Sequence, residues 1–327
     1  MRTPSVFRHA LLLLAAIACG AQTAQAQQAW RPQRPIHVIM PLAAGGAGEA
    51  ILRSVTEPLR DRMGQPIIIE PRPGGGQWIG ADAVIKSPPD GYNVLWASTS
   101  LLTFPMLTGS KRDMMKELVP VIHLGDTLML LAVNSDLPVK SVDELVRYAK
   151  ANPGKVNYGY FGTGSPQNIS GELIKSAAGI EMTPVPYKGS ALLLPDLLAN
   201  RVQVAIDAIT TLKPHVDAGR IRILALTNGY RSGLMPGVPP LAEVGFPNLA
   251  IAPWNGFFVP TGTSRDIVMT LNREIDAILQ APGYAEQLGK VAGGIPRGGS
   301  PERFTDLLHK DQAQYSQIIT SLGLKAD

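Results

Sequence analysis

Short apolar runs and amphipathic stretches alternate along most of the chain. Turn-forming residues bound each apolar run, as expected for a strand that is buried on both faces of a sheet. We expect strands over residues 36–40, 67–69, 94–97, 128–133, 156–160, 183–185, 202–206, 223–226 and 254–259, the last strand of the chain.

Apolar side chains at helical spacing follow most of these runs. The first such pattern ends at Gly64. Ser141 and Glu144 form a capping box that begins another helix. Ser300 precedes Pro301, a good first residue for a helix, at the start of the final pattern. We expect the later helices over residues 190–200, 211–218, 264–280, 284–291 and 301–322.

This order of strands and helices indicates an α/β fold. Alternation of the two predicts parallel sheets with helices on both faces. The chain has 327 residues, which is enough for two domains that each bury a core. We therefore expect two sheets rather than one.

The first 26 residues have the layout of a secretory signal peptide. Arg2 and Arg8 precede an apolar run over residues 10–18, and small residues follow up to Ala24 and Ala26. The run is too short to remain as a membrane-spanning helix. We therefore expect export to the periplasm with cleavage near Ala26, and Cys19 leaves lipid anchoring open as an alternative.

Charge and cysteine content exclude several classes of function. The chain has 30 basic and 26 acidic residues, and Arg2 and Arg8 of the expected signal peptide are two of the basic ones. The remaining surface is close to neutral, which gives no electrostatic footprint for nucleic acid. Cys19 is the only cysteine, so we expect the exported chain to contain no disulfide, thiol nucleophile or cysteine-bound metal.

The usual catalytic motifs are missing from the sequence. It contains no Gly-x-Ser-x-Gly elbow, no Gly-Lys-Ser/Thr phosphate loop and no His-Glu-x-x-His pair. His37 lies inside an apolar run and His215 near a helix end, which favours structural roles for both. We expect no catalysis, cofactor or metal, and a secreted α/β hydrolase with an unfamiliar site is the alternative.

Two glycine-rich turns each lie between an expected strand and an expected helix. Glycine lets backbone N–H groups approach a ligand, and the next helix adds unpaired N–H donors and its positive dipole end. Such turns suit an anion, although any α/β sheet has tight turns. Two of them predict a carboxylate at each end of a ligand in a cleft. The turns are Ala44-Gly45-Gly46-Ala47-Gly48 and Gly162-Thr163-Gly164-Ser165.

Polar residues near these turns are further candidates. Ser98, Thr99 and Ser100 follow a strand and form either part of the same rim or an ordinary turn. Gln77 follows a third glycine run that we expect to pass close to the first turn. Glu49 either stabilises the helix dipole or contacts a hydroxyl, an ammonium group or a bridging water.

Several motifs occur in order over nearly the whole chain after the expected signal peptide, and each alone is weak. Together they make the chain resemble the solute-binding receptors of tripartite tricarboxylate transporters, the Bug-type receptors. The motifs are Pro41-Leu-Ala-Ala-Gly-Gly-Ala-Gly-Glu49, Glu70-Pro-Arg-Pro-Gly-Gly-Gly76, Ile79-Gly-Ala81, Pro89-Asp-Gly-Tyr92, Pro153-Gly-Lys-Val-Asn-Tyr158, Val185-Pro-Tyr-Lys-Gly-Ser190 and Val238-Pro-Pro-Leu-Ala-Glu-Val-Gly245.

The resemblance implies a periplasmic-binding-protein-like (type II) clamshell. It has two α/β domains with mainly parallel sheets and a hinge that the chain crosses twice. Residues 33–126 with 253–327 form the first domain, and residues 127–252 form the second. The implied function is extracytoplasmic capture of a small di-, tri- or aromatic carboxylate in the interdomain cleft, without catalysis or a cofactor, and its delivery to a membrane permease.

The resemblance also implies which residues bind the ligand. They lie in the loops 42–49 and 161–168 and at strand ends beside them. The predicted ligand-binding residues are Leu42, Ala44, Gly45, Gly46, Ala47, Gly48, Glu49, Gln77, Ser98, Thr99, Ser100, Phe161, Gly162, Thr163, Gly164, Ser165, Asn168 and Asp207.

The first loop departs from the family pattern. Ala43 stands where the family has proline, Ala47 where it has glycine, Gly48 where it has threonine or serine, and Glu49 where it has aspartate. Loss of the hydroxyl at position 48 removes one donor to a carboxylate or its water, and Glu49 reaches further. These changes favour a larger, partly apolar or aromatic carboxylate.

Overall fold

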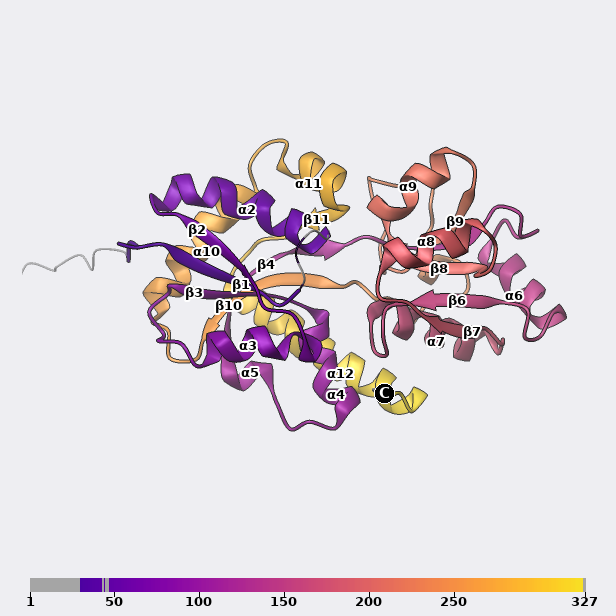
Figure 1. Cartoon of the computed structure of the whole chain (residues 1–327), viewed down its shortest axis with the longest axis horizontal. Helices are drawn as coiled ribbons and strands as arrows, with labels where there is room; N and C mark the ends of the chain where they lie inside the picture. The colour runs from indigo at the N-terminus through magenta and orange to yellow at the C-terminus, as the bar shows by residue number, and fades with distance from the viewer. Residues whose placement is uncertain (1–29, 43, 45–46, 326–327) are drawn as a thin grey trace, which may run out of the picture. The chain divides into compact units, whose positions relative to one another are not determined.

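The computed structural model describes residues 30–42, 44 and 47–325. The described residues from Pro32 onward form one compact unit. That unit contains two α/β domains, each built on one sheet (Figure 1). The expected signal peptide, with Cys19, lies outside the described residues.

The first sheet has six strands in the order β11-β4-β10-β3-β1-β2. Strand β1 is parallel to both β2 and β3, whereas β10 is antiparallel to β3 and β4, and β11 is antiparallel to β4. Figure 1 shows β10, late in the chain, beside the early strand β3. The strands are β1 (Ile36–Met40), β2 (Ile67–Pro71), β3 (Asn93–Ser98), β4 (Leu118–Thr127), β10 (Trp254–Pro260) and β11 (Gly294–Pro296).

Helices cover this sheet from several parts of the chain. Helix α2 packs against α10 and α11, and α4 packs against α12. Phe304 of α12 contacts Trp254 and Phe258 of β10, with ring centroids 5.6 and 5.3 Å apart, so buried aromatic rings hold the last helix against the sheet. The helices are α2 (Ala47–Met63), α3 (Trp78–Ile85), α4 (Thr99–Thr108), α5 (Met114–Glu117), α10 (Arg265–Leu279), α11 (Tyr284–Ala292) and α12 (Pro301–Leu322).

The second sheet has five strands in the order β7-β6-β8-β5-β9. Strand β6 is parallel to β7 and β8, and β5 is antiparallel to β8 and β9. Its strands are β5 (Met129–Asn134), β6 (Asn157–Tyr160), β7 (Thr183–Pro186), β8 (Val204–Ala208) and β9 (Ile221–Leu226). Its helices are α6 (Val142–Ala151), α7 (Pro166–Ala178), α8 (Ser190–Leu198) and α9 (Ile209–Asp217).

Most elements predicted from the sequence are confirmed. Helix α12 has the predicted bounds, and Ser300 caps it by accepting a hydrogen bond from the Arg303 N–H. Ser141 likewise accepts a hydrogen bond from the Glu144 N–H at the start of α6. Helix α2 ends at Met63, and Gly64 follows with a φ of 68°. Local capping chemistry therefore fixed these helix ends.

The predicted α/β fold of two domains is confirmed, and both sheets are mixed: most strands of each sheet run in one direction, while β10 and β11 in the first sheet and β5 in the second run against them. The strands that enter from distant parts of the chain, β4, β10 and β11 in one sheet and β5 and β9 in the other, pair antiparallel. Strand β11 also follows the strand that we expected to be last. It lies at an edge, where Pro296 is tolerated because an edge strand needs fewer N–H donors.

The sequence analysis also missed β4, α3 and α4. Strand β4 contains Pro120, His123 and Gly125, which interrupt its apolar pattern, and its register with β10 shifts twice. The division into residues 33–126 with 253–327 and residues 127–252 stays a prediction.

Candidate functional site

The predicted ligand loops lie at equivalent places in the two sheets. In the six-stranded sheet the chain leaves β1 for β2 on one side and later returns to β3 on the other. In the five-stranded sheet it leaves β6 for β7 and returns to β8 on the other side. Loops at the carboxyl ends of such strand pairs diverge and leave room for a ligand. Most predicted site residues lie at or just after the ends of β1, β3, β6 and β8, the strands at these two positions, whereas Gln77 lies between β2 and α3.

The first loop is described only in part. Ala43, Gly45 and Gly46 lie outside the described residues. Gly48 lies in the first turn of α2, where a Cβ would be 3.0 Å from both Leu42 Cδ1 and Trp96 Cη2. The absence of a side chain at position 48 therefore lets the start of α2 approach β3 closely. Ala44 is exposed, and Ala47 is the first residue of α2.

Glu49 lies in the first turn of α2 and forms an ion pair with Arg53. The Arg53 Nη2 atom is 2.6 Å from Glu49 Oε1, and the Glu49 side chain is only 15% exposed. An acid at this place also favours the helix dipole. The structural role proposed for Glu49 is therefore present, and contact with a ligand stays a prediction.

Gln77 and Ser98 are joined by two hydrogen bonds. The Gln77 side-chain amide donates to Ser98 Oγ over 2.5 Å, and Gln77 Oε1 accepts the Ser98 N–H over 3.0 Å. Gln77 is buried and has a φ of 81°, a left-handed conformation that a non-glycine residue seldom adopts. This pair fixes the β2–α3 loop against the end of β3.

The two residues after Ser98 begin α4. The Thr99 hydroxyl accepts the Trp254 N–H over 3.0 Å, and Thr99 is 1% exposed. Thr99 therefore holds β10 beside β3, while the side chain of Ser100 is half-buried in the first turn of α4.

Asn168 braces the second loop from inside α7. Its Oδ1 accepts the Gly164 N–H over 3.0 Å, and its Nδ2 donates to the Tyr158 hydroxyl over 3.1 Å. Ser165 caps α7 by accepting the Asn168 N–H, and the Ser165 N–H itself donates to the Gly162 carbonyl. The N–H groups of Gly164 and Ser165, expected to face a ligand, are thus used within the loop. Phe161 and Thr163, also predicted, are half-buried beside it.

Asp207 is a buried acid at the end of β8. It is 3% exposed, and it accepts hydrogen bonds from the Ala208 N–H over 2.7 Å and from Ser190, the first residue of α8. Burial raises the pKa of Asp207 to about 6, and the two hydrogen bonds oppose that rise. Asp207 and Ser190 therefore link the end of β8 to the start of α8, as Gln77 and Ser98 link the β2–α3 loop to the end of β3.

Asp207→Asn should weaken the pH dependence of stability near pH 6. The folded state binds the Asp207 proton more tightly than the unfolded state, whose pKa lies near 3.8. The free energy of unfolding therefore falls as the pH rises from about 4 to about 6, by on the order of 2 to 3 kcal/mol for a shift of this size. Urea unfolding at pH 4.5 and pH 8 measures this loss, which the variant should reduce.

Asp311 should contribute to the pH dependence of stability in the same range, because burial raises its pKa to about 6 as well. Asp311→Asn should remove a separate part of the same pH dependence, and the double variant should show the flattest profile. An Asp207→Asn profile that matched the wild-type slope would contradict the buried, proton-binding Asp207 described above.

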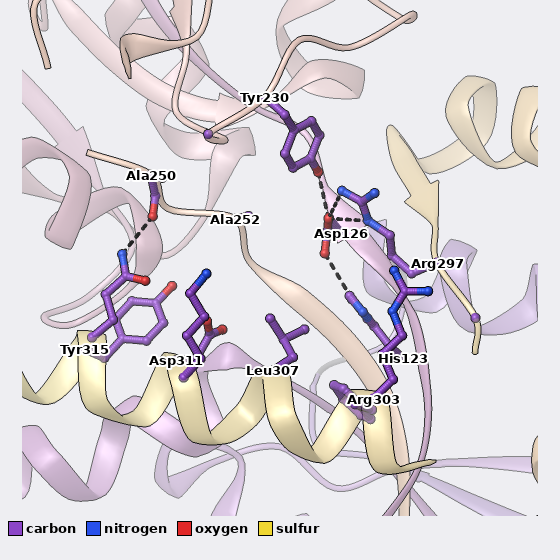
Figure 2. Close-up of a pocket in the computed structure, with 15 residues that line it drawn as sticks. His123, Asp126, Tyr230, Ala250, Ala252, Arg297, Arg303, Leu307, Asp311 and Tyr315 are labelled. Carbon is purple, nitrogen blue, oxygen red and sulfur yellow. Dashed lines mark hydrogen bonds and ion pairs between the residues drawn. The ribbon is translucent and has the colours of Figure 1, made fainter. Parts of the chain in front are cut away.

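The sequence analysis missed a second cluster of polar side chains, which is built around the carboxyl end of β4. Figure 2 shows Asp126 of β4 between Tyr230, Arg297 and His123. Asp126 Oδ2 accepts hydrogen bonds from the Tyr230 hydroxyl and from Arg297 Nε, each over 2.7 Å, and His123 Nε2 lies 3.0 Å from Oδ1. We call these four residues the Asp126 cluster.

The Asp126 cluster lines one side of a cavity of about 360 Å³. Arg303, Leu307 and Asp311 of α12 line the opposite side (Figure 2). The Arg297 guanidinium also lies over the Tyr230 ring, 4.7 Å from its centroid. Because Tyr230 follows β9 of the second sheet, the cluster connects the segment between β9 and β10 to strand β4 of the first sheet.

Two further properties concern the described residues alone. In the ranges 30–42, 44 and 47–325, no helix combines the length and the apolar character needed to cross a bilayer. Among the same residues, no three His, Cys, Asp or Glu side chains are grouped so as to hold a metal ion.

Known proteins share both the sequence pattern and the fold. The model of the tripartite tricarboxylate transporter family receptor matches residues 51–324. The UPF0065 protein in the tcbD-tcbE intergenic region of Pseudomonas sp. (strain P51) is 34% identical over 302 residues, which cover 90% of this chain and 88% of that protein.

Solved structures agree over similar lengths. R. palustris Rpa4515 with adipate has a TM-score of 0.81 and 33% identity, and the match covers 90% of this chain and 99% of that one. The periplasmic binding protein BugD has a TM-score of 0.77 and 26% identity, with coverage of 90% and 100%. Because the family model and these matches span most of the sequence, the chain belongs to the family of tripartite tricarboxylate transporter receptors, as its motifs predicted.

Proposed function

We propose that the protein is a periplasmic solute-binding receptor that captures a small carboxylate and delivers it to a tripartite tricarboxylate-type membrane permease. The observation that carries this proposal is the shared position of the predicted loops at the carboxyl ends of β1, β3, β6 and β8. The match to a protein solved with adipate supports a carboxylate ligand. The alternative of a secreted hydrolase has no support from the matched family.

The loops can bind an anion through backbone N–H groups, without a Lys or Arg side chain that pairs with it. Helices α2, α4, α7 and α9 are the next helices after the four strands, so their N-terminal amide groups and dipoles favour negative charge there. Asp207 and Glu49 are acids near these helix starts, and both already accept hydrogen bonds within the fold. We therefore infer that backbone amides, together with ordered water, bind the carboxylate groups. Closure of the two domains over the ligand strengthens these bonds by excluding solvent.

Thermal-shift and calorimetric titrations of residues 27–327 test this proposal. The probes are succinate, adipate, citrate and benzoate, each analysed afterwards for chemical change. A receptor gains stability as the ligand concentration exceeds its dissociation constant, so at least one acid should raise the melting temperature and be recovered intact. No shift or heat with any of these acids, or their chemical conversion, would overturn the proposal.

Gln77→Ala locates the site in the same assay. Loss of the two hydrogen bonds to Ser98 should loosen the loops at β2 and β3 and weaken binding of the best acid about tenfold or more, if about 1.4 kcal/mol of loop order is lost. Gln203→Ala is the matched control: Gln203 accepts the Asn157 N–H and donates to the Asn200 carbonyl, but Asn157 begins β6, at the opposite end of that strand. Equal losses of affinity would contradict the proposed site.

A further inference from the structure

Two aliphatic side chains are unusually exposed beside the predicted ligand loops. Ile79 is 56% exposed and Leu192 is 58% exposed, the highest values among the large hydrophobic side chains that the structure describes. Both lie in the first turn of a helix that begins at the carboxyl end of a parallel strand, α3 after β2 and α8 after β7. These side chains are in contact with water in the unliganded protein, and a ligand or partner that covers them would gain hydrophobic binding energy.

Ile79 lies close in sequence to Gln77 and its hydrogen-bonded partner Ser98, the polar pair of the first sheet. It comes two residues after Gln77, whose side chain is bonded to Ser98 at the end of β3. Its side chain also lies against the glycine run, where a Cβ on Gly74 would be 2.7 Å from Ile79 Cδ1. Gly74 and Gly75 have positive φ values of 117° and 57°, so the loop turns beneath the exposed Ile79 side chain.

Leu192 stands in the same relation to the polar pair of the second sheet. It comes two residues after Ser190, which is hydrogen-bonded to Asp207 at the end of β8. The next residue, Leu193, is 1% exposed, so the helix packs against the sheet through Leu193 while Leu192 stays accessible. Each sheet thus presents, at the end with the predicted loops, a hydrogen-bonded polar pair with one buried member, followed by one exposed aliphatic side chain.

We propose that Ile79 and Leu192 contact the apolar body of the ligand, so that the receptor selects a carboxylate with several consecutive methylene groups or a ring over a short, hydroxylated acid. This inference rests on the proposed function. Hydrogen bonds from backbone amides bind the carboxylate group of a short and of a long acid equally well. Contact with an aliphatic side chain, in contrast, increases the affinity for acids with more apolar surface. Each methylene group that becomes buried should tighten binding about fourfold.

Calorimetric titration of residues 27–327 with the straight-chain dicarboxylates from succinate to suberate tests this inference, with malate and citrate as polar probes. For wild type, affinity should rise along the series up to the length that the site accommodates and should exceed that for malate and citrate. Ile79→Ser and Leu192→Ser should each weaken adipate binding about fivefold or more and change succinate binding less than twofold. Both side chains are exposed, so the apo melting temperatures should stay near wild type.

Matched controls separate ligand contact from a general effect of apolar exposure. Val291 on α11 is 50% exposed, and Val291→Ser should leave the whole series unchanged. Ile79→Leu and Leu192→Met keep an apolar side chain, so each should keep the wild-type dependence of affinity on chain length. If wild type binds malate or citrate most tightly, or if the serine variants keep the wild-type dependence on length, this inference is overturned while the receptor function stands. If no carboxylate binds, both the inference and the proposed function fail.

Discussion

Asp126→Ala should lower the free energy of unfolding by about 2 to 4 kcal/mol, because it leaves the partners of a buried carboxylate without their acceptor. The Asp126 side chain is 7% exposed and binds the Tyr230 hydroxyl and the Arg297 guanidinium. Arg297 is 34% exposed, so water recovers part of its loss and the expected value lies below that of a fully buried pair. Urea unfolding at pH 7 measures the change.

The same cluster predicts loss of stability in acid. Burial raises the pKa of Asp126, but the contacts with His123, Arg297 and Tyr230 outweigh burial, and the pKa lies below its ordinary value of 3.8. The carboxylate therefore contributes stability above about pH 4, and this contribution is lost as the pH falls through the folded-state pKa. Below that pH the difference between wild type and Asp126→Ala should shrink.

Two variants test the assignment to this cluster. Tyr230→Phe removes only one hydrogen bond to the carboxylate and should lower the free energy of unfolding by about 1 to 2 kcal/mol. Asp217→Ala breaks an exposed i,i+4 pair with Lys213 and should leave the melting temperature nearly unchanged. A melting temperature for Asp126→Ala close to that of Asp217→Ala would show that the cluster contributes little.

Local patterns predicted much of the fold but not the Asp126 cluster. Strands β1 and β6 and the capped helices α6 and α12 each have a short-range signal that the structure confirms. The Asp126 cluster has no such signal, because Tyr230 and Arg297 are far from Asp126 in the sequence and meet it only through the antiparallel pairing of β4 with β10 and β11.

The sequence indicates where the candidate loops lie in the chain but not which contacts their residues make. Glycine-rich turns after two strands could be read from the sequence, and the structure describes the second of them in full. The polar groups that remain available could not be read from the sequence, since the Gly164 N–H donates to Asn168 and the Thr99 hydroxyl accepts the Trp254 N–H from a distant strand. Exposure was equally hidden: Leu192 and Leu193 look alike in the sequence, yet one is exposed and the other buried.

Gly164→Ala should damage both the fold and ligand binding, because two separate constraints require glycine there. Gly164 has a φ of 76°, and a Cβ would overlap the side chain of Leu107, which is only 5% exposed at the end of α4. Backbone strain and overpacking together should lower the free energy of unfolding by about 2 to 5 kcal/mol. Displacement of the loop should also weaken carboxylate binding about tenfold or more, as expected when over 1.4 kcal/mol of contact is lost.

Gly162→Ala separates the two constraints within the same loop. Gly162 has a φ of 93°, but a Cβ there would meet nothing within 4 Å, so this variant carries the backbone strain alone, about 1 to 2 kcal/mol. Leu107→Ala should relieve the overlap, so its cost in the Gly164→Ala background should be smaller than in wild type, a coupling that a double-mutant cycle measures. Equal destabilisation by Gly162→Ala and Gly164→Ala, with no coupling to Leu107, would mean that the Leu107 side chain moves aside and that strain alone fixes glycine at position 164.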